Sequence, residues 1–108
     1  MLATVIGRFD RRRVILDAGS KALSAERLTP RAPVLGLVLD HPELTVERLY
    51  EQHAIVSAPQ PSELRVGERV RIIPNHACTT ANLHRRALVA ENADVVDIWT
   101  IAAAGPGG

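Results

Sequence analysis

The chain has 108 residues, of which 46% are hydrophobic, a composition that suits one compact domain with its own core. Thirteen basic and twelve acidic residues leave a formal charge of +1, and only three residues are aromatic. Both observations argue against nucleic-acid binding, which needs a basic face and often a base-stacking platform. No apolar run reaches the length of about 18 residues that a membrane-spanning helix needs.

The start of the chain and its cysteine content predict a cytoplasmic protein. The apolar stretch at residues 2–6 is too short for a secretory signal, and the positive charges follow it where they should precede it. Cys78 is the only cysteine, which excludes an intramolecular disulfide and is consistent with a reducing compartment. Twelve of the thirteen basic residues are arginines, so Lys21 is the one side-chain amine for Schiff-base chemistry.

Short apolar segments separated by turn residues predict a mainly β chain. Residues 2–9 and 13–16 are expected to open it as a hairpin, and residues 21–27 to form a short helical turn. In residues 69–73 two arginines alternate with apolar residues, the period-2 pattern of a half-buried strand. The other predicted strands cover residues 34–39, 45–50, 53–57, 87–90 and 95–102.

These segments together predict the fold class and the domain boundaries. About seven or eight short strands with one or two short helical turns indicate a compact β-barrel or β-sandwich. The chain contains no internal repeat and no interior linker. We therefore expect one domain over residues 1–104 and a flexible tail at residues 105–108, whose sequence GPGG is too poor in side chains to fold.

Residues 74–83 form the stretch with the densest concentration of candidate site residues. His76 and Cys78 flank a single residue, and in an extended segment side chains two apart point to the same face. Imidazole nitrogen and thiolate sulfur suit zinc, and two protein ligands leave positions for water or substrate, as in catalytic sites. The alternative is a half-buried polar histidine beside a buried free thiol.

Three motifs in the same order resemble one enzyme family. Residues 74–105 are similar to the C-terminal signature of D-serine dehydratases and low-specificity D-threonine aldolases, which runs Pro-Asn-His-x-Cys (or His-x-Asp), Pro-Thr-x-Asn-Leu and later Trp. Residues 16–24 resemble that family's Asp-Ala-Gly-x-Lys-Ala motif, and residues 51–53 its Glu-Glu-His segment. Thr79 stands where the family commonly has proline, so we expect a less rigid ligand loop.

The resemblance implies a subunit of two domains, paired as a homodimer. An alanine-racemase-like barrel would hold pyridoxal phosphate through a lysine, and this chain would correspond to the β-rich C-terminal domain. The parent would be a lyase for D-3-hydroxy amino acids, with a metal acting as Lewis acid on the substrate's β-hydroxyl. Cys78 at the second ligand position favours zinc over manganese or magnesium, and therefore dehydration of D-serine or D-threonine over aldol cleavage.

The cofactor barrel is missing from this sequence. Lys21 matches the lysine of the upstream motif and not the cofactor lysine, so we expect no cofactor-binding residue and no lyase activity in the chain alone. A domain without its barrel should expose apolar side chains, for which we expect residues 34–39 or 95–102. Two alternatives stay open: a free-standing metal- or ligand-binding domain, and an interaction module that docks on a separately encoded barrel protein.

Five further residues are candidates for supporting the metal ligands or for facing the active site. Asp17 and Asn82 would orient the ligand histidine as hydrogen-bond acceptors, or else serve turns and caps. Lys21 would be structural or form a polar contact near the domain junction. His53 lies in a matched motif, and its alternative is a hydrogen-bonded imidazole at a strand end. Thr80, in the matched signature, completes the set.

Overall fold

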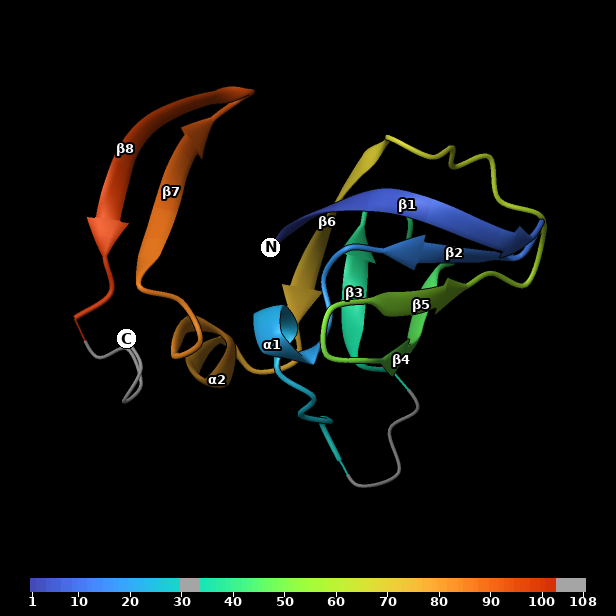
Figure 1. Cartoon of the computed structure of the whole chain (residues 1–108), viewed down its shortest axis with the longest axis horizontal. Helices are drawn as coiled ribbons and strands as arrows, with labels where there is room; N and C mark the ends of the chain where they lie inside the picture. Colours follow the sequence, from blue (N-terminus) through green and yellow to red (C-terminus); the bar gives the residue numbers. More distant parts are fainter. Residues whose placement is uncertain (30–33, 103–108) are drawn as a thin grey trace.

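The computed structural model describes residues 1–29 and 34–102, which form eight strands and two short helices (Figure 1). The predicted tail at residues 105–108 lies outside the described residues. No helix in the described ranges is long and apolar enough to cross a membrane. In chain order the elements are β1 (Leu2–Asp10), β2 (Arg13–Leu16), α1 (Ser20–Leu23), β3 (Gly36–Leu39), β4 (Thr45–Leu49), β5 (Ala54–Ser57), β6 (Arg69–Pro74), α2 (Ala77–Ala81), β7 (Arg86–Glu91) and β8 (Asp94–Thr100).

The first six strands close into an antiparallel barrel in the order β1-β2-β5-β4-β3-β6 (Figure 1). The first and last of these strands, β1 and β6, pair with each other, with Leu2 opposite Arg71. The mainly β class is therefore confirmed, and of its two predicted forms the barrel is the correct one. Every predicted strand is present, with ends that differ by at most two residues.

Alternation of side chains along the strands fills the interior of the barrel. Val70 and Ile72 are buried, whereas Arg71 between them is exposed, which confirms the pattern predicted for residues 69–73. Burying an aliphatic side chain of this kind contributes about 1.5–3 kcal/mol relative to leaving it in water. The largest fully buried side chains are Leu16, Ile72, Val5, Val14, Val38, Val46 and Val56.

Two upstream motifs of the sequence contact each other where α1 meets the loop between β4 and β5. A Cβ added at Gly19 would lie 2.2 Å from the main-chain oxygen of Tyr50, so this approach requires glycine. The main-chain nitrogen of Ser20 donates to the same oxygen at 2.7 Å, and that of Lys21 donates to the oxygen of Glu51 at 3.1 Å. The helix α1 is thereby fixed to the end of the barrel.

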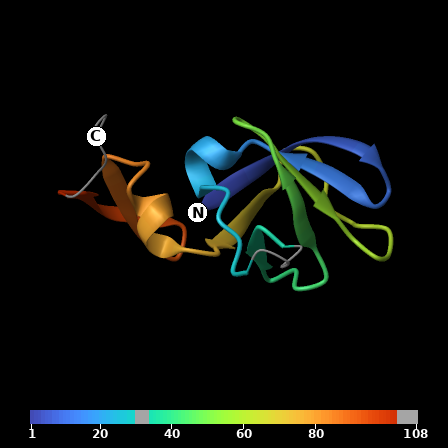
Figure 2. The same cartoon turned by 90° about the horizontal axis from the view of Figure 1, so that it is seen from below.

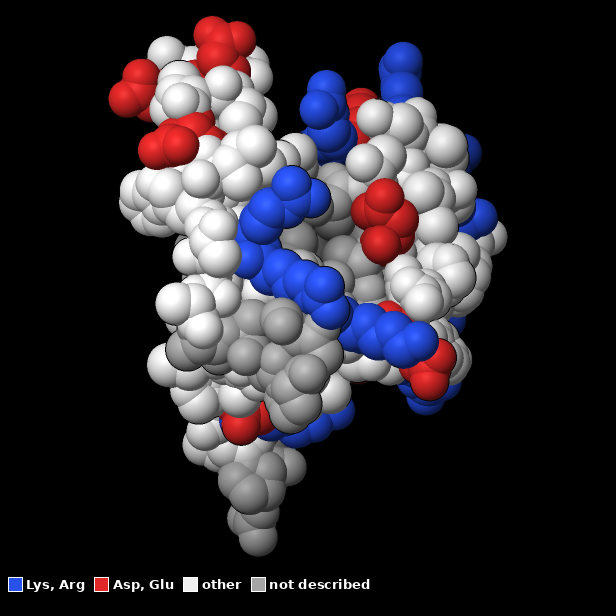
Figure 3. All heavy atoms as spheres, turned by 60° about the vertical axis from the view of Figure 1, so that its left-hand side comes forward, with Lys and Arg blue, Asp and Glu red and all other residues white. Residues whose placement is uncertain are grey.

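Strands β7 and β8 form a separate two-stranded hairpin beside the barrel (Figure 1, Figure 2). Every residue of β8 is exposed, including Trp99 with 60% of its surface accessible. Of the two segments predicted to expose apolar side chains, residues 95–102 expose Val95, Val96, Ile98 and Trp99, and residues 34–39 expose Leu37. Acidic side chains gather at the outer end of the hairpin (Figure 3).

Two segments differ from the prediction. The helix α1 ends where Ser24 adopts a positive φ of 65°, so the helical turn is shorter than the expected residues 21–27. The segment after β6 is not extended, because α2 begins directly after His76. The β-branched residues Thr79 and Thr80 favour a strand locally. Contacts with distant parts of the chain, from Thr79 to Glu26 and from Thr80 to Leu23, hold them in a helix instead.

Candidate metal site

The chain leaves the barrel after β6, and Asn75 ties this exit to the loop that follows α1. Its side-chain Nδ2 donates hydrogen bonds to the main-chain oxygens of Glu26, at 3.0 Å, and of Val34, at 2.9 Å. A carboxamide suits this position because its nitrogen carries two donors. The asparagine of the matched signature therefore has a structural role: it holds the segment that carries His76 against the loop after α1.

The helix α2 is fixed against α1 by two side chains. The hydroxyl of Thr80 is buried and donates to the main-chain oxygen of Leu23 at 2.6 Å. The Nε2 atom of His84 lies 2.8 Å from the main-chain oxygen of Ala22 and donates to it. Each such bond contributes about 0.5–1.5 kcal/mol. Thr80 is occupied by this structural contact, and an active-site-facing role for it stays a prediction.

His76 and Cys78 lie at the start of α2, and both are exposed. His76 precedes the helix with an extended main chain (φ −139°, ψ 107°), and Cys78 is the second helical residue. The expected extended conformation is not present, because α2 begins directly after His76. That both side chains reach one ion stays a prediction. Cys78 is a free, exposed thiol, so the alternative of a buried thiol is wrong.

A third polar side chain, that of Glu26, contacts the histidine. Its Oε2 lies against Nδ1 of His76, and both side chains are 48% exposed. The Oγ1 of Thr79 lies 3.4 Å from the same carboxylate oxygen and 3.1 Å from the main-chain oxygen of His76. Thr79, which stands in place of the family's proline, thus restrains the loop by polar contacts. Sequence reasoning missed Glu26 because it is 50 residues from His76 and outside the quoted motifs.

The available donors suit a borderline-soft cation but do not complete a coordination sphere. Imidazole nitrogen and thiolate sulfur are ligands that zinc accepts. Among the described residues, no group of three or more His, Cys, Asp or Glu side chains is placed to hold a metal ion. His76 and Cys78 therefore fit a site whose other positions are filled from outside this chain, by water, a substrate or another domain.

Asp17 and Asn82 make the contacts expected of turn and cap residues. The Oδ1 of Asp17 accepts a hydrogen bond of 2.7 Å from the main-chain nitrogen of Thr4, where β1 and β2 pair. Asn82 is the C-cap of α2, and its main-chain nitrogen donates to the oxygen of Cys78 at 3.0 Å. Neither contact involves the imidazole of His76, and a role in orienting it stays a prediction.

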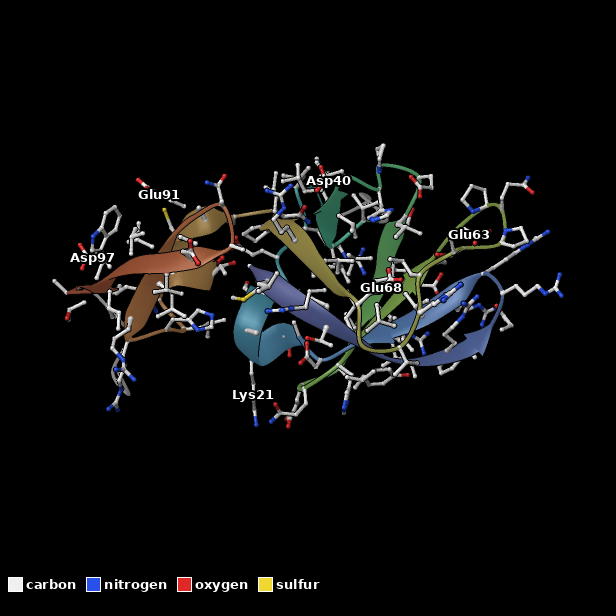
Figure 4. All side chains as sticks on the ribbon, turned by 90° about the horizontal axis from the view of Figure 1, so that it is seen from above. Lys21, Asp40, Glu63, Glu68, Glu91 and Asp97 are labelled. Atoms are coloured by element: carbon white, nitrogen blue, oxygen red, sulfur yellow. The ribbon has the colours of Figure 1, made fainter. Side chains whose placement is uncertain are left out.

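Lys21 points away from the barrel (Figure 4), and its Nζ lies 3.3 Å from Oε2 of Glu51. The two side chains are 62% and 76% exposed. A lysine that forms a Schiff base is activated by burial in an apolar pocket or by a neighbouring cation. An exposed ammonium beside a carboxylate meets neither condition, so Lys21 does not fit the cofactor lysine of a pyridoxal-phosphate enzyme.

His53 is exposed at an apolar hollow on the outer surface of the barrel. It directly precedes β5, at a strand end, and the hydrogen-bonded imidazole given as the alternative stays a prediction. A role near an active site stays a prediction for this residue. The hollow has a volume of about 300 Å³ and is lined by Ile6, Phe9, Ile15, Tyr50, His53 and Ile55.

Comparison with known proteins decides the family. The family described as "Putative serine dehydratase domain" matches residues 1–90, from β1 into β7. The chain belongs to this family. The resemblance inferred from the three sequence motifs is therefore confirmed, and the matched range includes His76, Cys78 and Glu26.

Relatives of this serine dehydratase domain include both short and long proteins. The uncharacterized protein Rv1414 of Mycobacterium tuberculosis is 41% identical over 108 residues, which cover 95% of this chain and 80% of the relative. The crystal structure of D-threonine aldolase from Filomicrobium marinum superposes with a TM-score of 0.80 and 29% identity, covering 96% of this chain and 27% of the aldolase. The chain thus spans about a quarter of that enzyme.

A second group of solved relatives includes a variant that is described as metal-free. D-threo-3-hydroxyaspartate dehydratase from Delftia sp. HT23 superposes with a TM-score of 0.75 and 28% identity, covering 92% of this chain and 30% of the dehydratase. Two variant structures of a D-threo-3-hydroxyaspartate dehydratase replace a histidine or a cysteine by alanine, at positions two residues apart. The cysteine variant is described as being in the metal-free form.

Proposed function

We propose that this chain is the metal-binding domain of a pyridoxal-phosphate-dependent lyase acting on D-3-hydroxy amino acids, with His76 and Cys78 as its zinc ligands. The observation that carries the proposal is the exposure of both side chains at the start of one short helix, which Asn75 and Thr80 hold in place. The dehydratase variants support it, because their replaced histidine and cysteine have the same spacing as this pair.

The chemistry of the site follows from its two ligand types. When bound, the metal would act as a Lewis acid on a substrate hydroxyl. The thiolate of Cys78 selects a softer cation than a carboxylate would, which favours zinc and the dehydratase reaction over aldol cleavage. His76 and Cys78 leave the outer side of the site open, so substrate could approach from a neighbouring domain. Manganese or magnesium would fit this pair less well.

The cofactor belongs to another part of the enzyme in this proposal. Lys21 is exposed and paired with Glu51, so an alanine-racemase-like barrel would supply the pyridoxal-phosphate lysine and the chain alone would be inactive. The length of the aldolase outside the match leaves room for such a domain. The free thiol of Cys78 supports a cytoplasmic location.

Titration with Co²⁺ tests the metal site in the 108-residue chain itself. We expect Co²⁺ to produce thiolate-to-metal absorption that Cys78→Ala abolishes and His76→Ala weakens at least tenfold. His41→Ala is the matched control, because His41 is another accessible histidine with a glutamate neighbour and should leave the titration unchanged. Cys78→Asp should shift the preference toward manganese or magnesium. An unaltered Co²⁺ spectrum in Cys78→Ala would refute the assignment.

A second function is association with another protein chain, either a separately encoded barrel protein or a second copy in a homodimer. Two observations favour it: the length of Rv1414 and the exposed side chains of the hairpin. The match covers four-fifths of Rv1414, so that relative has no room for a second large domain. The exposed apolar side chains of β7 and β8 offer a surface for a partner. Sedimentation velocity should show self-association that Leu88→Lys weakens. If the wild-type chain sediments as an ideal monomer at high concentration, the homodimer is excluded for the chain alone.

A further inference from the structure

Glu26 is held at both its main chain and its side chain by the segment that carries the metal ligands. Its main-chain oxygen accepts the hydrogen bond from Asn75, and its carboxylate contacts the imidazole of His76 and the hydroxyl of Thr79. Three residues within the stretch 75–79 therefore contact the same glutamate, which lies in a distant part of the sequence. This convergence limits the positions that the carboxylate can take relative to the ring.

The contact with Glu26 determines which ring nitrogen of His76 carries hydrogen. An ionised carboxylate only accepts hydrogen bonds, so Nδ1, which faces it, must be the donor. In the neutral imidazole the in-plane lone pair available to a metal then lies on Nε2, the other ring nitrogen. Histidines that bind metals commonly donate their second ring N–H to a carboxylate, which fixes the ring and raises its basicity as a ligand.

We propose that Glu26 is the positioning residue of the metal site, which sets the tautomer of His76 and directs its Nε2 toward the cation. This inference rests on the proposed function of His76 and Cys78. In this proposal Glu26 acts through the imidazole, whose Nδ1 its Oε2 contacts, and is not itself a ligand.

A second histidine–glutamate pair shows what a plain surface contact looks like in the same chain. Nδ1 of His41 lies 3.6 Å from Oε1 of Glu43, two residues away in sequence, beyond ordinary hydrogen-bond distance. The His76 pair joins segments 50 residues apart, and Asn75 fixes the main chain of its glutamate. Glu43 is therefore the matched control for every substitution of Glu26.

Long-range ¹H–¹⁵N NMR of the metal-free chain tests the inference without reference to metal binding. For the neutral imidazole of His76 we expect the Nδ1–H form in the wild type and in Glu26→Gln, whose amide oxygen can still accept. We expect the Nε2–H form to become dominant in Glu26→Ala, whereas Glu43→Ala should leave His76 unchanged. A wild-type His76 in the Nε2–H form, or an Ala variant with no change, overturns the proposal.

Co²⁺ affinity then separates a positioning residue from a ligand. Loss of a group that orients a metal-binding histidine typically weakens affinity by about 10–100-fold. We expect Glu26→Ala to fall in this range, Glu26→Gln to lose less, and Glu43→Ala to match the wild type. A loss in Glu26→Ala as complete as in Cys78→Ala, or a change below about twofold, contradicts the positioning role. If the wild-type chain binds no Co²⁺, the proposed metal function fails, and the NMR result still decides whether Glu26 sets the tautomer.

Discussion

The barrel and the hairpin of this domain differ in how their strands are paired and how far their side chains are buried. In the barrel, each of the six strands has a neighbour on both sides, and its inward side chains are buried. In the hairpin, β7 and β8 have only each other, and the whole of β8 is exposed. A two-stranded hairpin alone is at best marginally stable in water. The barrel thus carries the stability of the domain, whereas the hairpin leaves its side chains and strand edges exposed.

The largest expected effect contrasts one leucine from each region. Leu16 is 1% exposed inside the barrel, and Leu88 is 66% exposed on the hairpin. Leu16→Ala should lower the free energy of unfolding by about 2–5 kcal/mol, because it leaves a cavity in a packed core. Leu88→Ala should change it by about 0.5 kcal/mol or less. Urea denaturation followed by circular dichroism measures both, and equal losses would show that the hairpin is part of the folded core.

A smaller effect is expected where α1 meets the barrel. Gly19→Ala places a Cβ against the main-chain oxygen of Tyr50, and main-chain atoms cannot move aside as a flexible side chain does. We expect a loss of about 1–3 kcal/mol, the range of overpacking substitutions. Gly7→Ala is the control, since its Cβ would first meet the flexible end of Ile15 at 3.3 Å. If the control loses as much stability as Gly19→Ala, close approach is not the cause.

The smallest effect is expected for the ion pair between Lys21 and Glu51 on the surface beside the barrel. Both side chains are mostly exposed, and exposed pairs contribute about 0–1 kcal/mol. Lys21→Gln and Glu51→Gln should each change the midpoint of urea unfolding only slightly, and 1 M NaCl should remove the difference from wild type. A larger loss of stability that persists in 1 M NaCl would indicate that Lys21 supports the contact at Gly19 through interactions other than the ion pair.

The sequence predicts the strands well because their signal is local. Val70 and Ile72 alternate with arginines, and this pattern needs no knowledge of the rest of the chain to indicate a half-buried strand. The order of strands around the barrel depends on contacts between distant segments, so the sequence leaves barrel and sandwich open. The pairing of β1 with β6 decides between them.

The candidate site was harder to predict because it depends on tertiary contacts. Thr79 and Thr80 favour a strand by their side chains, yet Thr80 lies in a helix that is tied to Leu23. The spacing of His76 and Cys78 and the family signature predict these two side chains as metal ligands. Glu26 was missed, since only the folded chain brings a glutamate outside these motifs to the imidazole of His76.

The pairing of β1 with β6 has a consequence for how this domain can be combined with others. Because the strand that enters the barrel lies beside the strand that leaves it, both ends of the unit emerge next to each other. Each barrel strand already pairs with two neighbours, so attachment to another domain requires no strand exchange. Such a unit can be joined to a larger enzyme, or separated from it, without opening its sheet, which suits a family whose relatives match it over 80% of one protein and 27% of another.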